Sequence, residues 1–191
     1  MTETQSKITS FQSKPSILIR ELVFADLPGL EWDGEYTHFR NVYVDLFQRI
    51  QKGTAKAWVA VDQNQFMIGQ VFLQLNSDRL ELADGWFRAY LYSFRIRPLY
   101  RNQGLGTQML GVLENTLLKL KFARLTLNVA RVNLDAIRLY KRCGFQIVAE
   151  EPGTWSYPDH NQVWQTIHEP SWRMEKILIP AQPHSNGGTK I

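Results

Sequence analysis

Cysteine is nearly absent from this sequence, which holds only Cys143. A single cysteine excludes an intramolecular disulfide and a zinc site built from several thiolates, and it is typical of a reducing compartment. We expect Cys143 to be a small buried apolar residue, because no histidine lies near it in sequence to activate the thiol. The histidines also lack the close pairing of a metal site, so no bound metal is expected; they are His38, His160, His168 and His184.

Long apolar runs and blocks of like charge are missing as well. No run of 18 apolar residues occurs, and the N-terminus lacks the basic start and apolar stretch of a signal peptide. The net charge of +4 is modest and contains no block of five like charges, so it demands no nucleic-acid partner. These absences predict a cytoplasmic protein that binds neither nucleic acid nor a membrane.

The composition is that of an ordinary globular protein. Apolar residues make up 44% and charged residues 21% of 191 positions, enough for one domain with a substantial core. Residues 1–16 are polar, and residues 180–191 contain Pro, His, Asn and a glycine pair, so both are expected to be loose tails. A single domain is therefore predicted over residues 17–179.

Hydrophobic periodicity predicts an α/β fold with a mixed sheet and helices on its faces. A short helix should begin at Asp26 to Pro28, with the aspartate as N-cap. Residues 151–171 are expected to be a long loop. Strands are predicted at 17–22, 57–61, 66–75, 86–97, 125–129, 145–149 and 172–179, and further helices at 36–51, 105–121 and 134–142.

A glycine loop joins the strand that ends near Arg97 to the helix that begins at Leu105. Its sequence from Arg101 to Gly106, Arg-Asn-Gln-Gly-Leu-Gly, places backbone N–H groups at a helix N-terminus, where the helix dipole favours an anion such as phosphate. No Gly-Lys-Ser/Thr follows, and the dinucleotide pattern fails after Gly106, so neither of those nucleotide sites is present. A plain strand-to-helix turn remains the alternative.

Three motifs in order resemble the GNAT superfamily of acetyl-coenzyme A (acetyl-CoA) dependent N-acetyltransferases. They are the run from Phe94 to Gly106, Leu-Thr-Leu-Asn-Val at 125–129, and N-x-x-A-x-x-x-Y-x-x-x-G-F at 133–145. The resemblance extends over about residues 17–179. It implies a central, mostly antiparallel sheet of about seven strands that splays between the fourth and fifth strands, with helices on both faces.

The resemblance also implies where acetyl-CoA would bind. The diphosphate would lie on the backbone N–H groups of Asn102, Gln103, Gly104, Leu105, Gly106 and Thr107, with Arg101 beside it. The pantetheine arm would pair with the backbone of Phe94 and Ile96, which requires an open strand edge and is helped by a bulge near Ser93. Asn133 would hold the pantetheine or the substrate end by its side-chain amide.

Tyr140 would lie near the thioester sulfur as the catalytic residue. A phenol with a pKa of about 10 gives a proton uphill to a thiolate whose conjugate acid has a pKa of about 8.5, so we expect mainly a hydrogen-bond donor, with proton relay only if the tyrosine pKa is lowered. The general base is open among a water chain, the strand residues Tyr92 and Ser93, and four carboxylates. Those carboxylates are Asp33, Glu35, Asp84 and Glu150.

Acceptor recognition is expected from residues 32–38 and from the aromatic segment 151–171, which would flank the opening of the sheet. The implied activity is acetyl transfer to a primary amine by direct attack in a ternary complex. A domain that binds or senses acyl-CoA without turnover is the alternative. The acceptor, a small molecule or a peptide, is not identified by the sequence, and neither is pairing into a homodimer.

Overall fold

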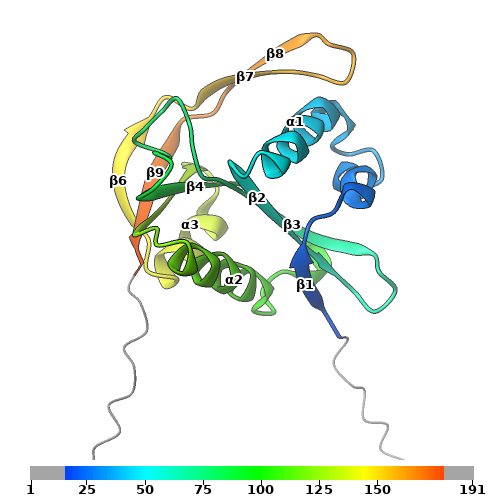
Figure 1. Cartoon of the computed structure of the whole chain (residues 1–191), viewed down its shortest axis with the longest axis horizontal. Helices are drawn as coiled ribbons and strands as arrows, with labels where there is room; N and C mark the ends of the chain where they lie inside the picture. Colours follow the sequence, from blue (N-terminus) through cyan, green and yellow to red (C-terminus); the bar gives the residue numbers. More distant parts are fainter. Residues whose placement is uncertain (1–15, 179–191) are drawn as a thin grey trace, which may run out of the picture.

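A computed structural model describes residues 16–178 of the chain (Figure 1). All but Ser16 of the two predicted tails lies outside these residues. A seven-stranded sheet has the order β1-β2-β3-β4-β5-β9-β6, in which only β4 and β5 are parallel neighbours. Its strands are β1 (Leu18–Glu21), β2 (Ala55–Val61), β3 (Met67–Gln74), β4 (Arg88–Ile96), β5 (Arg124–Ala130), β6 (Gln146–Glu151) and β9 (Ser171–Ile177).

Helices cover both faces of this sheet, as predicted (Figure 1). Helices α2 and α3 lie on one face over a large apolar core, and α1 lies with the 3-10 helix η1 on the other face over a second core. The helices are η1 (Phe24–Glu31), η2 (Thr37–Phe39), α1 (Arg40–Gln51), η3 (Pro98–Tyr100), α2 (Leu105–Lys119) and α3 (Leu134–Arg142). The predicted mixed α/β fold is confirmed.

Helices α2 and α3 form because their apolar side chains recur with the helical period. The buried residues of α2 include Leu105, Met109, Leu113 and Leu117, each four positions after the last, so they make one stripe toward the sheet. Helix α3 ends before Gly144, whose φ of +90° suits glycine. Together they hold the glycine loop and Tyr140 against the same face of the sheet.

A bulge in β4 decides which side chains face each core. Tyr92 pairs with Phe72 and Arg95 with Gln70, so β4 has one more residue than β3 between the two pairs. Ser93 lies in this bulge with a φ of +52°, which confirms the predicted irregularity. Because of the extra residue, Phe94 packs with the core under α2, whereas Arg95 faces α1.

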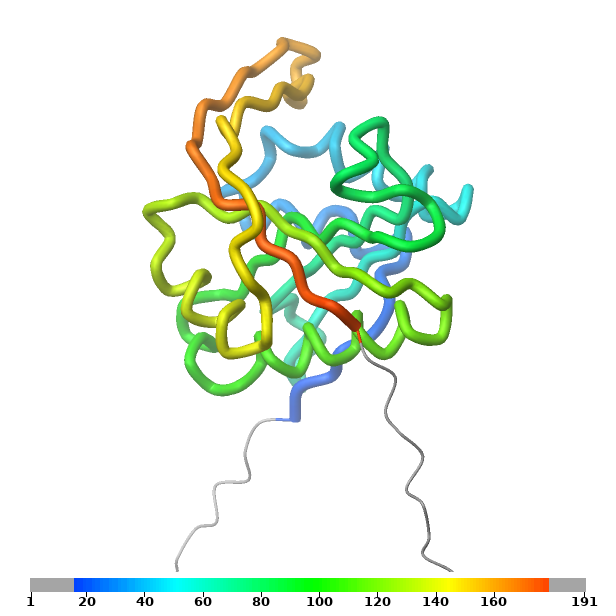
Figure 2. Tube along the Cα trace, turned by 90° about the vertical axis from the view of Figure 1, so that its left-hand side faces the viewer, coloured from blue at the N-terminus to red at the C-terminus, as the bar shows by residue number. Residues whose placement is uncertain are grey.

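Two local predictions were wrong. Residues 151–171 are not a loop: they complete β6 and then form a hairpin of β7 (Thr154–Pro158) and β8 (Trp164–His168), seen above α1 in Figures 1 and 2. Asp26 is not the N-cap of η1 but its third residue, and its carboxylate accepts from the N–H of the true N-cap, Val23, at 2.8 Å.

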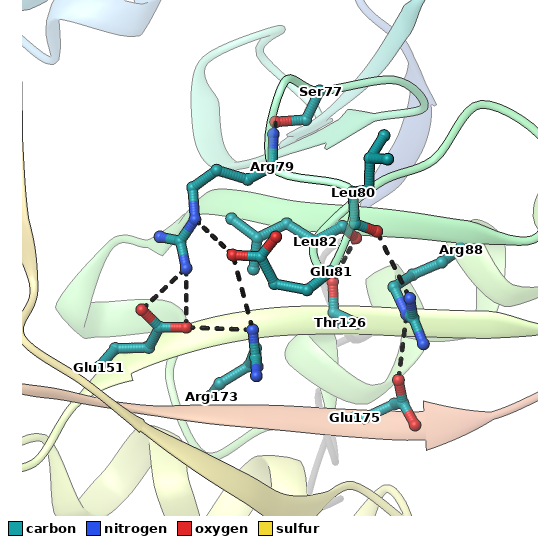
Figure 3. Close-up of polar contacts among 10 residues, drawn as sticks. All are labelled: Ser77, Arg79, Leu80, Glu81, Leu82, Arg88, Thr126, Glu151, Arg173 and Glu175. Carbon is teal, nitrogen blue, oxygen red and sulfur yellow. Dashed lines mark hydrogen bonds and ion pairs between the residues drawn. The ribbon is translucent and has the colours of Figure 1, made fainter.

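Ion pairs hold the segment between β3 and β4 against the sheet (Figure 3). Arg79 donates to both carboxylate oxygens of buried Glu151 at 2.9 Å and also pairs with Glu81 at 2.8 Å. Arg173 of β9 reaches Glu151 at 3.3 Å, so two arginines neutralise one buried carboxylate. The Thr126 hydroxyl donates to the carbonyl of Leu82 at 2.7 Å, which fixes the same segment from β5.

Candidate active site

The site begins where β4 and β5 separate. The two strands pair only over Arg88–Leu91 and Arg124–Leu127. Beyond this point β5 continues to Ala130 beside β9, while the rest of β4 pairs with β3 alone. The predicted splay between the fourth and fifth strands is therefore present, and it leaves one edge of β4 open at Phe94 and Ile96.

The glycine loop lies at the end of this open edge. Gly104 is the N-cap of α2 with a φ of +85°, and Asn102 also has a positive φ, of +59°. Within residues 16–178, none of the six N–H groups from Asn102 to Thr107 donates to a protein acceptor, and the first helical bond is from the N–H of Gln108 to the Gly104 carbonyl at 3.1 Å. Six donors at a helix N-terminus form a cradle for an anion.

The side chain of Arg101 folds back from this loop along the open edge. Its Nε donates to the carbonyl oxygen of Ile96 at 2.8 Å, on the strand that we expected to pair with pantetheine. The terminal nitrogens of its guanidinium have no acceptor in the part of the chain that the structure describes. Arg101 can therefore contact a ligand in the gap through its fork while it remains anchored through Nε.

Tyr140 lies on the buried face of α3, in the core that α2 also covers. Its side chain is 6% exposed and packs edge-on against Phe145, with ring centroids 5.6 Å apart. Burial raises the pKa of the Tyr140 hydroxyl well above its usual range. The condition for proton relay, a lowered pKa, is therefore not met, and the neutral hydroxyl is suited to donate a hydrogen bond.

Asn133 caps helix α3. Its Oδ1 accepts from the N–H of Ala136 at 3.2 Å, so the side-chain carbonyl has a local structural partner. The amide NH2 has no hydrogen-bond partner among the described residues and remains able to donate to a ligand. The structure thus gives Asn133 a capping role beside the ligand role implied by the resemblance.

The two segments expected to recognise the acceptor do come together. Phe39 of η2, just after 32–38, lies 4.7 Å from Tyr157 and 6.0 Å from Trp155 between ring centroids, and these two belong to the β7–β8 hairpin. His38 also lies 6.2 Å from Tyr157. An aromatic wall therefore joins η2 to the hairpin on the face of the sheet opposite α2.

A buried tryptophan positions the other end of this wall. Trp32 donates its indole N–H to Oε1 of Gln70 at 2.9 Å and packs edge-on against Tyr36 at 5.6 Å. Arg95 of β4 lies over the Tyr36 ring, with its guanidinium carbon 4.0 Å from the centroid, and donates to the hydroxyl of Tyr43 at 3.2 Å. Arg95 was not among the residues predicted from sequence, because the family motif drew attention only to its neighbours.

Most of the candidate bases are engaged elsewhere. Asp33 pairs with Arg97 at 2.9 Å, and Glu150 pairs with Arg131 at 2.9 Å. For Asp84, burial acts to raise the pKa, but hydrogen bonds from three backbone N–H groups (of Trp86, Phe87 and Arg88) outweigh it and hold the pKa below its usual range. Asp84 therefore stabilises a turn, and it is poorly suited to accept a proton at neutral pH.

The remaining candidates differ in kind. Burial raises the pKa of Tyr92 well above its usual range, and it raises the pKa of Tyr90, which was not a candidate, to about 12, so neither phenol ionises near neutral pH. Glu35 lies near the Tyr36 hydroxyl, whose pKa is raised by burial first and by this carboxylate second. Of the four carboxylates, Glu35 alone lies beside the aromatic wall without an ion-pair partner in the described residues.

Asn128 is a second polar residue of the site that was not predicted. It follows Leu127, the last residue of β5 that pairs with β4, and its Oδ1 is buried without a hydrogen-bond partner in the described part of the chain. Leu127 and Val129 face the core under α2, so Asn128 faces the aromatic side. Asparagine is depleted in strands, and its position inside Leu-Thr-Leu-Asn-Val was the signal that could have revealed it.

The sequence and the geometry agree with a known family. The model of the acetyltransferase (GNAT) family matches residues 21–145. The chain belongs to this family. Solved structures of acetyltransferases share its overall fold.

Individual relatives are less similar. The spermine/spermidine N(1)-acetyltransferase of Bacillus subtilis strain 168 is 42% identical over 64 residues, which are 33% of this chain and 42% of that enzyme. The chain thus matches less than half the length of this curated relative. The ribosomal-protein-S18-alanine N-acetyltransferase of Escherichia coli has a TM-score of 0.63 at 23% identity, covering 88% of this chain and 98% of that one.

A third relative concerns the ligand. The structure of Arabidopsis thaliana NAA60 in complex with a bisubstrate analogue has a TM-score of 0.61 at 21% identity, covering 86% of this chain and all of that one. At this identity the likeness shows the fold alone.

Within residues 16–178 no cluster of potential metal ligands occurs, and no helix has the length and apolar character needed to cross a membrane.

Proposed function

We propose that this chain transfers an acetyl group from acetyl-CoA to a primary amine by direct attack within a ternary complex. One observation carries the proposal: six consecutive backbone N–H groups, Asn102 to Thr107, have no acceptor among the described residues and lie beside an open strand edge. The diphosphate would accept from these groups, and Arg101 and Asn133 would contact the rest of the cofactor.

In this arrangement the chain's own groups would stabilise each charge that develops. The acceptor nitrogen attacks the thioester carbonyl carbon, and the N–H of Phe94 or Ile96 donates to the oxygen as it becomes negative. The carbon–sulfur bond then breaks, and the hydroxyl of Tyr140 donates a hydrogen bond to the leaving thiolate. Water would take the proton lost by the amine, because the nearby phenols do not ionise near neutral pH and Asp33, Asp84 and Glu150 are held by other groups; Glu35 is the carboxylate that would act in its place.

Water as the proton acceptor has a consequence for pH dependence. Tyr90 and Tyr92 stay protonated at neutral pH, so the ionisation of neither phenol should limit the rate there. We expect kcat/KM to rise with pH until the acceptor's own amine pKa, near 10.4 for a lysine-like amine and about 7.8 for an α-amine. Rate profiles for two acceptors of different pKa should be displaced by that difference, and coinciding profiles would point to a base on the enzyme.

The test of the function is release of free thiol from acetyl-CoA in the presence of a broad panel of amines. Acetylated product detected by mass spectrometry, in an amount equal to the thiol, would support direct transfer. Accumulation of an acetylated enzyme without an acceptor would contradict it.

Part of the proposal is that the protein acts in the cytoplasm, supported by its single cysteine.

The alternative, an acyl-CoA binding or sensing domain without turnover, is favoured by one observation. Asp33, Asp84 and Glu150 are all held by arginines or backbone N–H groups, so none of the three is free to act as a base. Calorimetry that shows tight acetyl-CoA binding, together with no thiol release for any amine, would select this alternative.

A further inference from the structure

Arg95 is an unusual cation in this protein. Among the lysines and arginines of residues 16–178, it alone is partly buried and lacks a carboxylate within ion-pair distance. The other unpaired ones are exposed to solvent: Lys52, Arg101, Lys119, Lys121, Lys141 and Arg142. A guanidinium stays charged when it is buried, so Arg95 keeps a positive charge that water solvates only in part.

The surroundings of Arg95 fix its position and leave most of its guanidinium N–H groups without a hydrogen-bond acceptor. Its guanidinium carbon lies 4.0 Å from the ring centroid of Tyr36 and 5.2 Å from that of Phe39. One terminal nitrogen donates to the Tyr43 hydroxyl at 3.2 Å, and the guanidinium makes no other hydrogen bond among the described residues. The two rings partly compensate the lost hydration, and a planar set of N–H donors remains for a ligand.

The position of Arg95 separates it from the diphosphate site. It lies between Phe94 and Ile96 on the open part of β4, but those two pack with the core under α2, whereas Arg95 contacts the opposite core at Tyr43. The cradle of N–H groups lies at the start of α2. Arg95 thus faces the aromatic wall, where the acceptor would enter.

No acid among the described residues neutralises this charge. Glu35 lies near the hydroxyl of Tyr36, on whose ring Arg95 is stacked, yet no ion pair joins Glu35 to Arg95. Arg101 is a second cation close to Tyr36. Its charge acts to lower the pKa of Tyr36, although burial has a larger effect and raises that pKa. A cationic acceptor group placed here would be repelled by Arg95, because like charges brought together disfavour binding, whereas Arg101 would be engaged by the cofactor.

We propose that Arg95 binds a carboxylate of the acceptor, so that the preferred acceptor is a primary amine that also carries an anionic group and not a polyamine. This inference rests on the proposed function, since it concerns the acceptor of that reaction. Arg95 would be a specificity residue: its fork would donate to the two carboxylate oxygens side by side, which orients the amine toward the open edge of β4.

The experiment compares acceptors that differ only in their far end. Two sets serve: 6-aminohexanoate, hexylamine and 1,6-diaminohexane, and the three-carbon set of β-alanine, propylamine and 1,3-diaminopropane. We expect kcat/KM to be highest for the aminocarboxylate in at least one set, by about tenfold or more over the diamine, as one well-placed charge pair would give. Spermidine is included as the polyamine.

Variants assign the preference to Arg95. Arg95→Gln should abolish the preference mainly through KM for the aminocarboxylate, and Arg95→Lys should retain part of it, because a lysine keeps the charge but loses the planar fork. Lys119→Gln, which removes one exposed positive charge at the end of α2, should leave the ranking unchanged. The KM for acetyl-CoA and the melting temperature of each variant show that folding and cofactor binding persist.

Calorimetry on the CoA-loaded protein measures the same ranking without turnover. Should no acceptor release thiol while aminocarboxylates still bind more tightly than diamines, and only with Arg95 present, the proposed function fails, and what stands is that Arg95 binds a carboxylate. A wild-type preference for diamines or spermidine, or an aminocarboxylate preference that survives Arg95→Gln, overturns the inference.

Discussion

Among single residues, Tyr140 is the one on which the proposed chemistry depends most; its hydroxyl is neutral and its ring packs against Phe145. Its hydroxyl has no protein partner in the described part of the chain, so Tyr140→Phe should change the free energy of unfolding by less than about 1 kcal/mol. We expect kcat to fall by about 100-fold, because the leaving thiolate loses its hydrogen-bond donor. Thiol-release kinetics measure this, with KM for acetyl-CoA unchanged as the internal control.

An unchanged kcat in Tyr140→Phe would contradict the catalytic role and leave Tyr140 as a packing residue. The ranking of acceptors should not change in this variant, because its side chain packs with the core under α2 and not with the aromatic wall. That separation distinguishes a defect in chemistry from a defect in acceptor binding.

At the scale of the element, the loop before α2 tests the diphosphate cradle. Gly104 has a φ of +85°, so Gly104→Ala forces a side chain into the left-handed region at a cost of about 1–2 kcal/mol. We expect weaker acetyl-CoA binding, by several-fold, because the loop N–H groups shift. Isothermal calorimetry with acetyl-CoA measures it.

Gly111 supplies the matched control, since it lies inside the same helix with nothing within 4 Å of an added Cβ. Gly111→Ala should stabilise the protein by about 0.5–1 kcal/mol and leave acetyl-CoA affinity unchanged. Equal loss of affinity in both variants would show that the loop conformation is not what matters.

A second prediction at this scale concerns the segment between β3 and β4. Arg79→Leu leaves the buried carboxylate of Glu151 with Arg173 alone, and we expect a loss of about 2 kcal/mol in the free energy of unfolding. Denaturant unfolding measures it. The double variant Arg79→Leu with Glu151→Leu should lose less than the sum of the single changes, since the buried carboxylate is removed together with Arg79 and Arg173 keeps Glu81 at 3.8 Å.

Much of the fold followed from sequence because α2 and α3 bury one side each, which produces clear periodicity, and because the central strands β2 and β3 are short, almost fully buried apolar runs. The hairpin of β7 and β8 was missed for the opposite reason. Trp155 and Trp164 are largely exposed, at 44% and 70%, so neither strand shows the strict alternation of a buried face. Its position depends on contacts across the chain, such as the side-chain amide of Asn41 donating to the carbonyl of Asp159, which no local pattern contains.

The candidate site divides in the same way. The N–H cradle was predictable because glycine and helix start are local signals. Arg95 was not, because it stands out only by lacking a carboxylate partner among the described residues. Asn128 left a signal in its strand motif, but its buried oxygen without a donor in the described part of the chain did not show there. Such deficits are visible only when the surrounding atoms are placed.

At the scale of the whole molecule, acid should unfold the protein through its paired carboxylates. For Asp26, burial acts to raise the pKa, but the two hydrogen bonds from Arg20, at 2.7 and 2.8 Å, and the N–H of Val23 hold the pKa below its usual range. The pKa values of Glu31, Glu81 and Asp84 are also lowered. Because the folded-state pKa values lie below the unfolded ones, this stability is present above about pH 4 and is lost as pH falls further.

Melting temperature measured between pH 7 and pH 3 checks this, and Asp26→Asn should flatten the curve at its acidic end while lowering it at neutral pH. A melting temperature that stays constant down to pH 3 would show that these pairs contribute little to folding.

The additional residue at Ser93 has an effect beyond its own turn. It reverses the alternation of side chains along β4. Phe94 and Ile96 therefore face the core under α2, and Arg95 between them faces α1. Deleting it would exchange those sides, burying the cation beneath α2 and turning Phe94 toward α1. If the proposed function holds, the length of β4, and not only its composition, would separate the acceptor from the cofactor's diphosphate.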